Sequence, residues 1–188
     1  MSARLRERRT ANRPIRAAGW NPPDRATLAE RLESHFLFGP DRARAIAESW
    51  RSGQPHDAAR LVETAQRGLQ SWKIFGLPVK LDPERLDWQA VPDAARYDRR
   101  WVWELNRHQF LFTFARAFVL TGEESYARRI CDLVESWVEA NPAGRGVNWS
   151  SALEVGVRAI SWLWTLPLVL DWPGFEDRLL AAWLGSLC

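Results

Sequence analysis

Hydrophobic residues between Arg100 and Leu120 occur nearly all round a helix, and neither glycine nor proline interrupts them. The pattern predicts one helix that is largely buried. We expect it to end at Thr121-Gly122, because glycine readily adopts the left-handed conformation of a helix C-cap. The large apolar positions are Leu105, Phe110, Leu111, Phe112, Phe114, Phe118 and Val119.

The segments that follow differ in character. Residues 123–140 are amphipathic, with an apolar face that includes Tyr126 and Trp137 opposite a charged face, which predicts a surface helix. A further helix, predicted from Ser151 to about Leu166, is almost wholly apolar, and its Ser-Ala-Leu-Glu start has the spacing of a capping box. Buried, amphipathic and buried helices in this order favour stacked antiparallel pairs, with one helix inside and one outside.

The two segments predicted to be buried also share a similarly spaced pair of charged residues. Glu104 and Arg107 recur as Glu154 and Arg158 about fifty residues later, within the period range of helical arrays. We therefore predict an all-α fold, an (α/α) toroid built from antiparallel helix pairs, in preference to a simple bundle.

The flanking segments predict smaller elements. Short amphipathic helices are expected before residue 66, one of them starting at Pro40, and residues 72–79 predict an extended segment with room for a short strand. Residues 173–188 predict a helix without a partner for its apolar face. The toroid is therefore expected to be incomplete, with its C-terminal remainder beyond Cys188.

Length and charge limit the organisation. A chain of 188 residues suits one domain, which we place at 21–188. The formal net charge of +3 and pI near 9.3 reflect an arginine-rich start, so residues 1–20 are predicted to be a basic disordered arm. Such an arm can bind nucleic acid or acidic lipid, but a solvated tail is the favoured interpretation.

Targeting and cofactor signals are weak. The N-terminus lacks the apolar core of a signal peptide, which favours a cytoplasmic location with periplasmic or secreted alternatives open. The most apolar stretch, 159–170, is too short for a membrane span. Neither cysteine has metal-ligand spacing, and two cysteines make no disulfide framework, so no cofactor or metal is expected.

Four ordered motifs carry a resemblance to a known family. They are WELNRHQ at 103–109, LTGEESYA at 120–127, SWVEANP at 136–142 and VNWSSALE at 147–154. Together they resemble the N-terminal helical domain of heparinase II/III-type polysaccharide lyases, over roughly residues 72–170. The resemblance implies β-elimination on a uronate-containing acidic polysaccharide, with Asn, Tyr and His catalysts downstream of these motifs and none assignable in this chain.

The motifs supply candidate substrate-binding residues, namely Glu104, Asn106, Arg107, His108, Asn148, Trp149, Glu154 and Arg158. Arginine can hold a uronate or sulfate through paired N–H groups, and tryptophan can stack on a sugar ring. Structural roles are equally open: a Glu104–Arg107 pair, a Glu154–Arg158 pair and Asn148 as a cap. At least two of Arg107, His108, Asn148 and Arg158 are expected to line one concave surface.

The rival function from another class is a non-catalytic helical-repeat module that binds glycan or protein. Nucleic-acid binding through the basic arm is the weakest alternative, and no nucleic-acid partner is predicted. Most of the twelve tryptophans fall in apolar helical stripes, so core packing is the expected role of each.

Overall fold

The structure is a computed structural model that describes residues 21–36, 38–92 and 97–187. The predicted basic arm lies outside the described residues. The helices are α2 (Arg25–His35), α3 (Pro40–Gly53), α4 (Pro55–Gln70), α5 (Arg99–Asn106), α6 (Gln109–Thr121), α7 (Glu124–Ala140), α8 (Ala152–Val169) and α9 (Asp177–Gly185), with a 3-10 turn η1 (Val147–Trp149). An antiparallel hairpin joins β1 (Trp72–Ile74) to β2 (Leu77–Val79).

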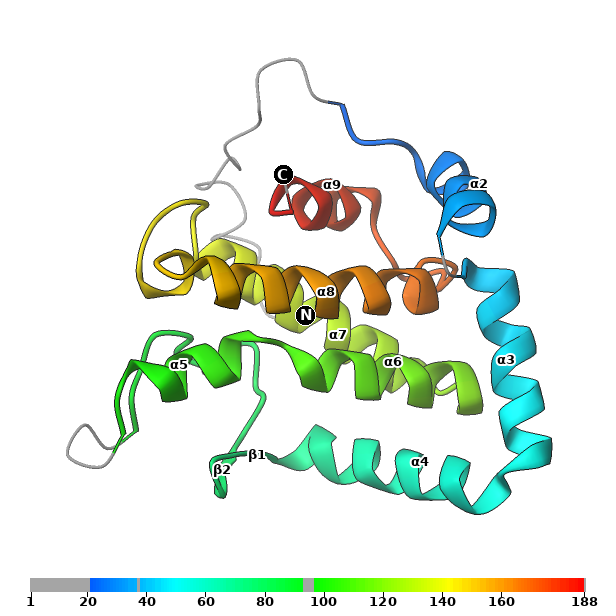
Figure 1. Ribbon diagram of the computed structural model, residues 1–188, viewed down its shortest axis with the longest axis horizontal. Coiled ribbons are helices and arrows are strands. Elements are labelled where there is room, and N and C mark those ends of the chain that lie inside the picture. Colours follow the sequence, from blue (N-terminus) through cyan, green and yellow to red (C-terminus); the bar gives the residue numbers. More distant parts are fainter. Residues whose placement is uncertain (1–20, 37, 93–96, 188) are drawn as a thin grey trace.

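The helices form two layers. α4, α6 and α8 lie side by side, with α3 across one end, and α7 packs behind α6 with α9 next to it (Figure 1). α6 and α8 run in the same direction, and α7 returns between them in sequence. The prediction of a mostly helical fold is therefore confirmed, but α8, predicted to be wholly buried, exposes Leu153, Ile160 and Leu163.

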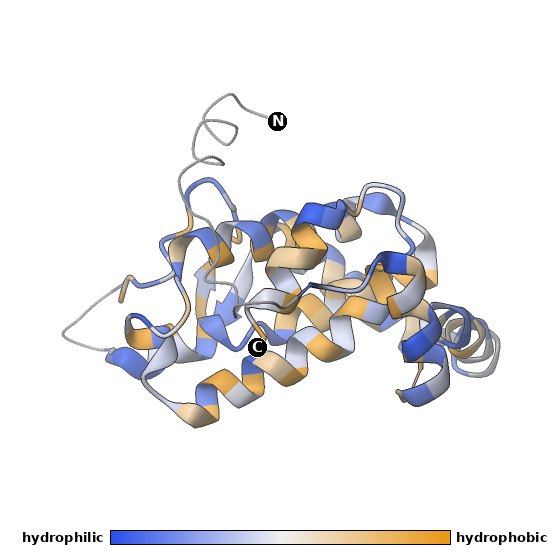
Figure 2. Ribbon diagram, turned by 90° about the horizontal axis from the view of Figure 1, so that it is seen from above, coloured by the Kyte–Doolittle hydropathy of each residue, from blue (hydrophilic) through white to orange (hydrophobic). Residues whose placement is uncertain are grey.

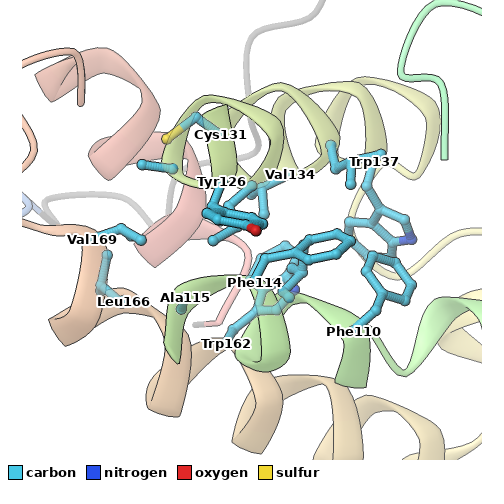
Figure 3. Packing of buried hydrophobic residues seen from close by; sticks show 14 of the residues in the cluster. Phe110, Phe114, Ala115, Tyr126, Cys131, Val134, Trp137, Trp162, Leu166 and Val169 are labelled. Atoms are coloured by element: carbon cyan, nitrogen blue, oxygen red, sulfur yellow. The ribbon is translucent and has the colours of Figure 1, made fainter. Parts of the chain in front are cut away.

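The core lies between these layers. Phe110 and Phe114 of α6 meet Trp137 of α7 and Trp162 of α8, and all are at most 1% exposed (Figure 3). Trp137 and Trp162 meet edge to face, with ring centroids 5.3 Å apart. Colouring by hydropathy shows hydrophobic residues concentrated along the helices and hydrophilic residues in most loops (Figure 2). Aromatic packing therefore holds the two layers together.

The predicted helix over residues 100–120 is interrupted. α5 ends at Asn106 and α6 begins at Gln109, and His108 between them adopts a left-handed conformation with φ of 58°. Neither glycine nor proline marks this break. Asn106 and His108 are instead turned into the interior, where both are 1% exposed, and an unbroken helix could not have brought both to their partners.

The C-terminal helix is shorter than predicted and well packed. α9 contacts α7, and Leu179, Leu180 and Trp183 are buried. Trp183 lies 5.6 Å from Trp162 between ring centroids. The expectation that this helix lacks a partner for its apolar face was therefore wrong.

α8 is long and apolar enough to cross a bilayer by length and composition alone, contrary to the expectation from 159–170. In this fold it packs along α6, and its charged residues Glu154 and Arg158 are buried with protein partners. The capping box at its start does not form, since Ser151 occupies the N-cap position without a side-chain hydrogen bond. One face of α8 therefore belongs to the core, while Leu153, Ile160 and Leu163 on the same helix are exposed.

The predicted C-cap at Gly122 is confirmed, with φ of 74°. A Cβ there would meet no atom within 4 Å, so Gly122→Ala introduces only backbone strain. We expect it to lower the free energy of unfolding by about 1 kcal/mol. The matched control is Gly53→Ala, which is helical, equally uncrowded and expected to be neutral or stabilising. Urea denaturation measures the free energy of unfolding of both variants. Equal changes in Gly122→Ala and Gly53→Ala would contradict the role of Gly122 as a C-cap.

Candidate functional site

A group of polar side chains meets in the interior where α5, η1 and α8 come together. Asn106, His108, Asn141, Asn148 and Arg158, here called the buried polar cluster, are each at most 3% exposed. Burying a polar group destabilises the folded state unless the group is hydrogen-bonded. The hydrogen-bond partners of these residues therefore indicate the role of the cluster.

The asparagines tie the 141–151 loop to the helices. Asn106 donates from Nδ2 to the Trp88 carbonyl at 2.9 Å, and its Oδ1 accepts from Trp137 Nε1 at 2.6 Å. Asn148 donates to Asn141 Oδ1 at 2.7 Å, and Asn141 donates to the Trp137 carbonyl at 3.0 Å. The Trp137 carbonyl also accepts from the Asn141 backbone N–H at 3.0 Å. Asn148 therefore anchors the loop through its side chain and does not act as a helix cap.

His108 is enclosed by tryptophan rings. Its Nδ1 accepts a hydrogen bond from Trp162 Nε1 at 2.8 Å, and the ring lies 5.1 Å from Trp88 and 5.5 Å from Trp137 between centroids. Because Nδ1 accepts, the neutral ring carries its proton on Nε2, which has no partner in the described part of the chain. Burial, reinforced by the charge of Arg158, lowers the pKa of His108 well below 6.5.

Arg158 is held by backbone and aromatic rings. Its Nη2 donates to the Asn148 carbonyl at 3.1 Å, and its guanidinium lies 4.3 Å from the Trp137 ring centroid and 5.0 Å from that of Trp149. Burial lowers the pKa of Arg158 to about 10, so it stays protonated at neutral pH. Cation–π contact with both rings compensates part of the lost hydration.

The expected Glu154–Arg158 pair does not form, because Glu154 belongs to a different group. Arg107 donates from Nε and Nη2 to the two Glu154 carboxylate oxygens, at 2.8 and 2.9 Å, and its Nη1 pairs with Glu104. The expected Glu104–Arg107 pair is present, and we name these three residues the ion-pair triad. The hydrogen bonds from Glu154 are the main reason that the pKa of Arg107 is raised. The triad ties α5 to α8.

Exposure separates the predicted binding residues into two sets. Asn106, His108, Asn148, Glu154 and Arg158 are buried, whereas Glu104, Arg107 and Trp149 remain partly exposed. The structure does bring His108, Asn148 and Arg158 together, but inside the protein and not along a concave surface.

Sequence reasoning missed several members of this region. Neither Asn141 nor Trp88 was among the predicted binding residues. Two polar residues flanking a glycine-rich loop, Asn141 and Asn148, were the signal that could have paired them. Among the described residues, no group of three or more His, Cys, Asp or Glu side chains is placed to hold a metal ion.

The protein-family model described as Heparinase II/III N-terminus matches residues 50–187. Among solved structures, the fold is similar to a heparan sulfate lyase HepC mutant from Pedobacter heparinus, with a TM-score of 0.60 and 21% sequence identity. The similarity covers 86% of this chain but only 28% of the lyase chain. A comparison with curated proteins finds no match.

Proposed function

The chain belongs to the heparinase II/III family, whose N-terminal region it matches. On that premise we propose that it is part of a polysaccharide lyase that cleaves uronate-containing acidic polysaccharide by β-elimination. The observation that carries the proposal is the family match over residues 50–187. Similarity of fold to a heparan sulfate lyase supports it, and the two-layer arrangement of parallel α6 and α8 with α7 outside supports an (α/α) toroid.

β-Elimination removes the proton α to the uronate carboxylate and expels the C4 oxygen. It requires a group that neutralises the carboxylate, a base and an acid. His108 is unsuited to either proton transfer, because it is 1% exposed and its Nδ1 is occupied by Trp162. We therefore assign the described helices to substrate binding and to shaping the site, and not to proton transfer.

The partly exposed residues are the ones that can reach a glycan. Glu104 offers carboxylate oxygens to sugar hydroxyls, and Trp149 offers part of an indole ring. Arg107 already donates to two carboxylates, so it positions Glu104 and leaves little capacity for a uronate. The buried polar cluster fixes the loop that carries Trp149. The Trp149 Nε1 donates to the Asn141 carbonyl at 3.3 Å.

A non-catalytic glycan- or protein-binding module is the second candidate. In the described ranges, the asparagines of the cluster and His108 are all buried, and Tyr126 is 1% exposed with its hydroxyl donating to Gln66. Both candidates accommodate this, because the lyase catalysts are expected downstream of these helices. No exposed Asn, Tyr and His set is assembled from these residues. A lyase assay on the full-length gene product, by unsaturated-uronate absorbance, separates this candidate from the lyase.

The test measures binding and turnover by the 188-residue chain. Fluorescently labelled tetrasaccharides from heparan sulfate and alginate are compared with a neutral cello-oligosaccharide. We expect at least about tenfold tighter binding of the acidic sugars, weakening with added salt because charge-assisted contacts are screened. No increase in unsaturated-uronate absorbance is expected from this chain.

Equal binding of acidic and neutral sugars would contradict the assigned substrate class. Turnover by this chain would show that a proton-transfer group lies within it, and would overturn the binding-only assignment of these helices.

A further inference from the structure

The face of α6 that points away from the core carries an unusual residue. Phe110, Leu111, Phe114 and Ala115 are buried, whereas Gln109, Phe112, Thr113 and Arg116 follow the i, i+3, i+4, i+7 spacing of the opposite face and keep partial or full exposure. The buried face meets α7, where Phe114 stacks with Tyr126.

Arg116 is half-buried. Its Nε is inaccessible to solvent and makes no hydrogen bond, and none of the described residues forms an ion pair with its guanidinium. Burial alone lowers its pKa, with no carboxylate acting against that effect. By contrast, Arg107 on the preceding helix is paired with two carboxylates.

An aromatic surface lies beside the free guanidinium. Arg116 stacks on the ring of Phe112 with its Cζ 4.7 Å from the centroid, and Phe112 contacts Trp164 of α8 with centroids 5.8 Å apart. Trp164 is itself partly exposed and supported by Phe38 at 5.4 Å. Stacking on Phe112 holds the guanidinium plane in place and so restricts the directions in which its N–H groups can donate.

We propose that Arg116, with Phe112 and Trp164 beside it, binds the carboxylate or sulfate group of an acidic polysaccharide, while the aromatic rings contact the apolar face of a sugar. The inference rests on the proposed function for the identity of the ligand. The anion-binding property itself rests only on the geometry of Arg116.

The physical reason is the cost of an unpaired charge. Removing a cation from water without a partner is unfavourable, and the penalty is recovered when an anion arrives with two parallel N–H···O bonds. Arginine suits this role because its planar fork matches carboxylate and sulfate geometry. Arg158 also forms no ion pair with the described residues, but it is only 3% exposed, whereas Arg116 keeps partial exposure through which an anion can reach it.

The experiment compares Arg116→Met with the matched control Arg60→Met in the full 188-residue chain. Arg60 lies on α4, is highly exposed and pairs with Asp57. Without anions and at low salt, Arg116→Met should raise Tm, because an uncompensated charge is replaced by an apolar side chain of similar length. Sodium sulfate, compared with sodium chloride at equal ionic strength, should raise Tm more for the wild type than for Arg116→Met. The Arg60→Met variant should respond to sulfate like the wild type.

Binding of the labelled heparan sulfate and alginate tetrasaccharides provides the second readout. Arg116→Met should weaken both by about tenfold, the loss expected for one charge-assisted contact, and should leave any binding of the neutral sugar unchanged. Loss for heparan sulfate alone would assign the site to sulfate, and loss for both would assign it to the shared anionic chemistry.

The outcomes separate the two proposals. Equal acidic-sugar binding by wild type and Arg116→Met overturns the inference and leaves the proposed function standing. If the wild type binds no acidic sugar, the proposed function fails and the sulfate measurement decides the anion site. A lowered Tm in Arg116→Met together with an unchanged sulfate response overturns the site and makes Arg116 structural.

Discussion

Replacing Arg107 with alanine is expected to lower the free energy of unfolding by about 3 kcal/mol, because it leaves a buried carboxylate without its partner. The Glu154 side chain is only 5% exposed and receives both of its charge-assisted bonds from Arg107. The Arg107 side chain is 29% exposed, so the cost should lie at the lower end of values for fully buried pairs. Chemical denaturation with circular dichroism measures it.

Matched variants show which partner matters. Glu104→Gln removes the other carboxylate, whose side chain is 27% exposed, and should cost less than about 1 kcal/mol. The double variant Arg107→Met/Glu154→Leu removes both charges and should recover most of the stability lost in Arg107→Ala. Equal costs for the Arg107→Ala and Glu104→Gln variants would show that the triad does not act through Glu154. Helix content must be followed in any glycan-binding measurement on Arg107.

Acid is expected to destabilise the protein through His108. Above about pH 6.5 the ring is neutral in both the folded and the unfolded state. Below that pH His108 binds a proton in the unfolded chain but stays neutral in the folded chain, because its folded pKa is well below 6.5. The free energy of unfolding should then fall by roughly 1.4 kcal/mol per pH unit until the folded pKa is reached.

The structural consequence is equally specific. Protonation places a hydrogen on Nδ1, which removes the acceptor for Trp162 Nε1 and adds charge next to Arg158. His108→Gln should abolish the slope between about pH 6.5 and pH 5, above the main titration of carboxylates. His35 and His56 lie at exposed positions, so His35→Gln/His56→Gln should retain it. A slope that survives in His108→Gln would assign the acid sensitivity elsewhere.

Helical periodicity predicted much of the fold because burial of one apolar face is written locally in the sequence. α7 was predicted as Glu123 to Ala140 and found at Glu124–Ala140, and the C-cap at Gly122 follows from a single residue type. The break at His108 was missed for a different reason. It depends on where Trp88, Trp137 and Trp162 lie, and their sequence distances from His108 carry no periodic signal.

The candidate binding residues show the same division. Four of the predicted binding residues, Asn106, His108, Asn148 and Arg158, converge in one buried cluster. Whether such a group faces solvent or the interior depends on how helices pack over it. Arg116 was not selected, because an arginine on an otherwise apolar helix reveals its missing counterion only when every neighbour is in place.

By itself the sequence determined the helical class and the family, since these depend on residue order within a turn or a motif. Tertiary structure decided the partners of the charged groups. Glu154 pairs with Arg107 from another helix although Arg158 stands one turn away on its own, because hydrogen-bond geometry at close range outweighs proximity along the chain. It also left Arg116 and Arg158 without an ion pair among the described residues, and we propose Arg116 as the anion-binding residue because it alone of the two keeps partial exposure.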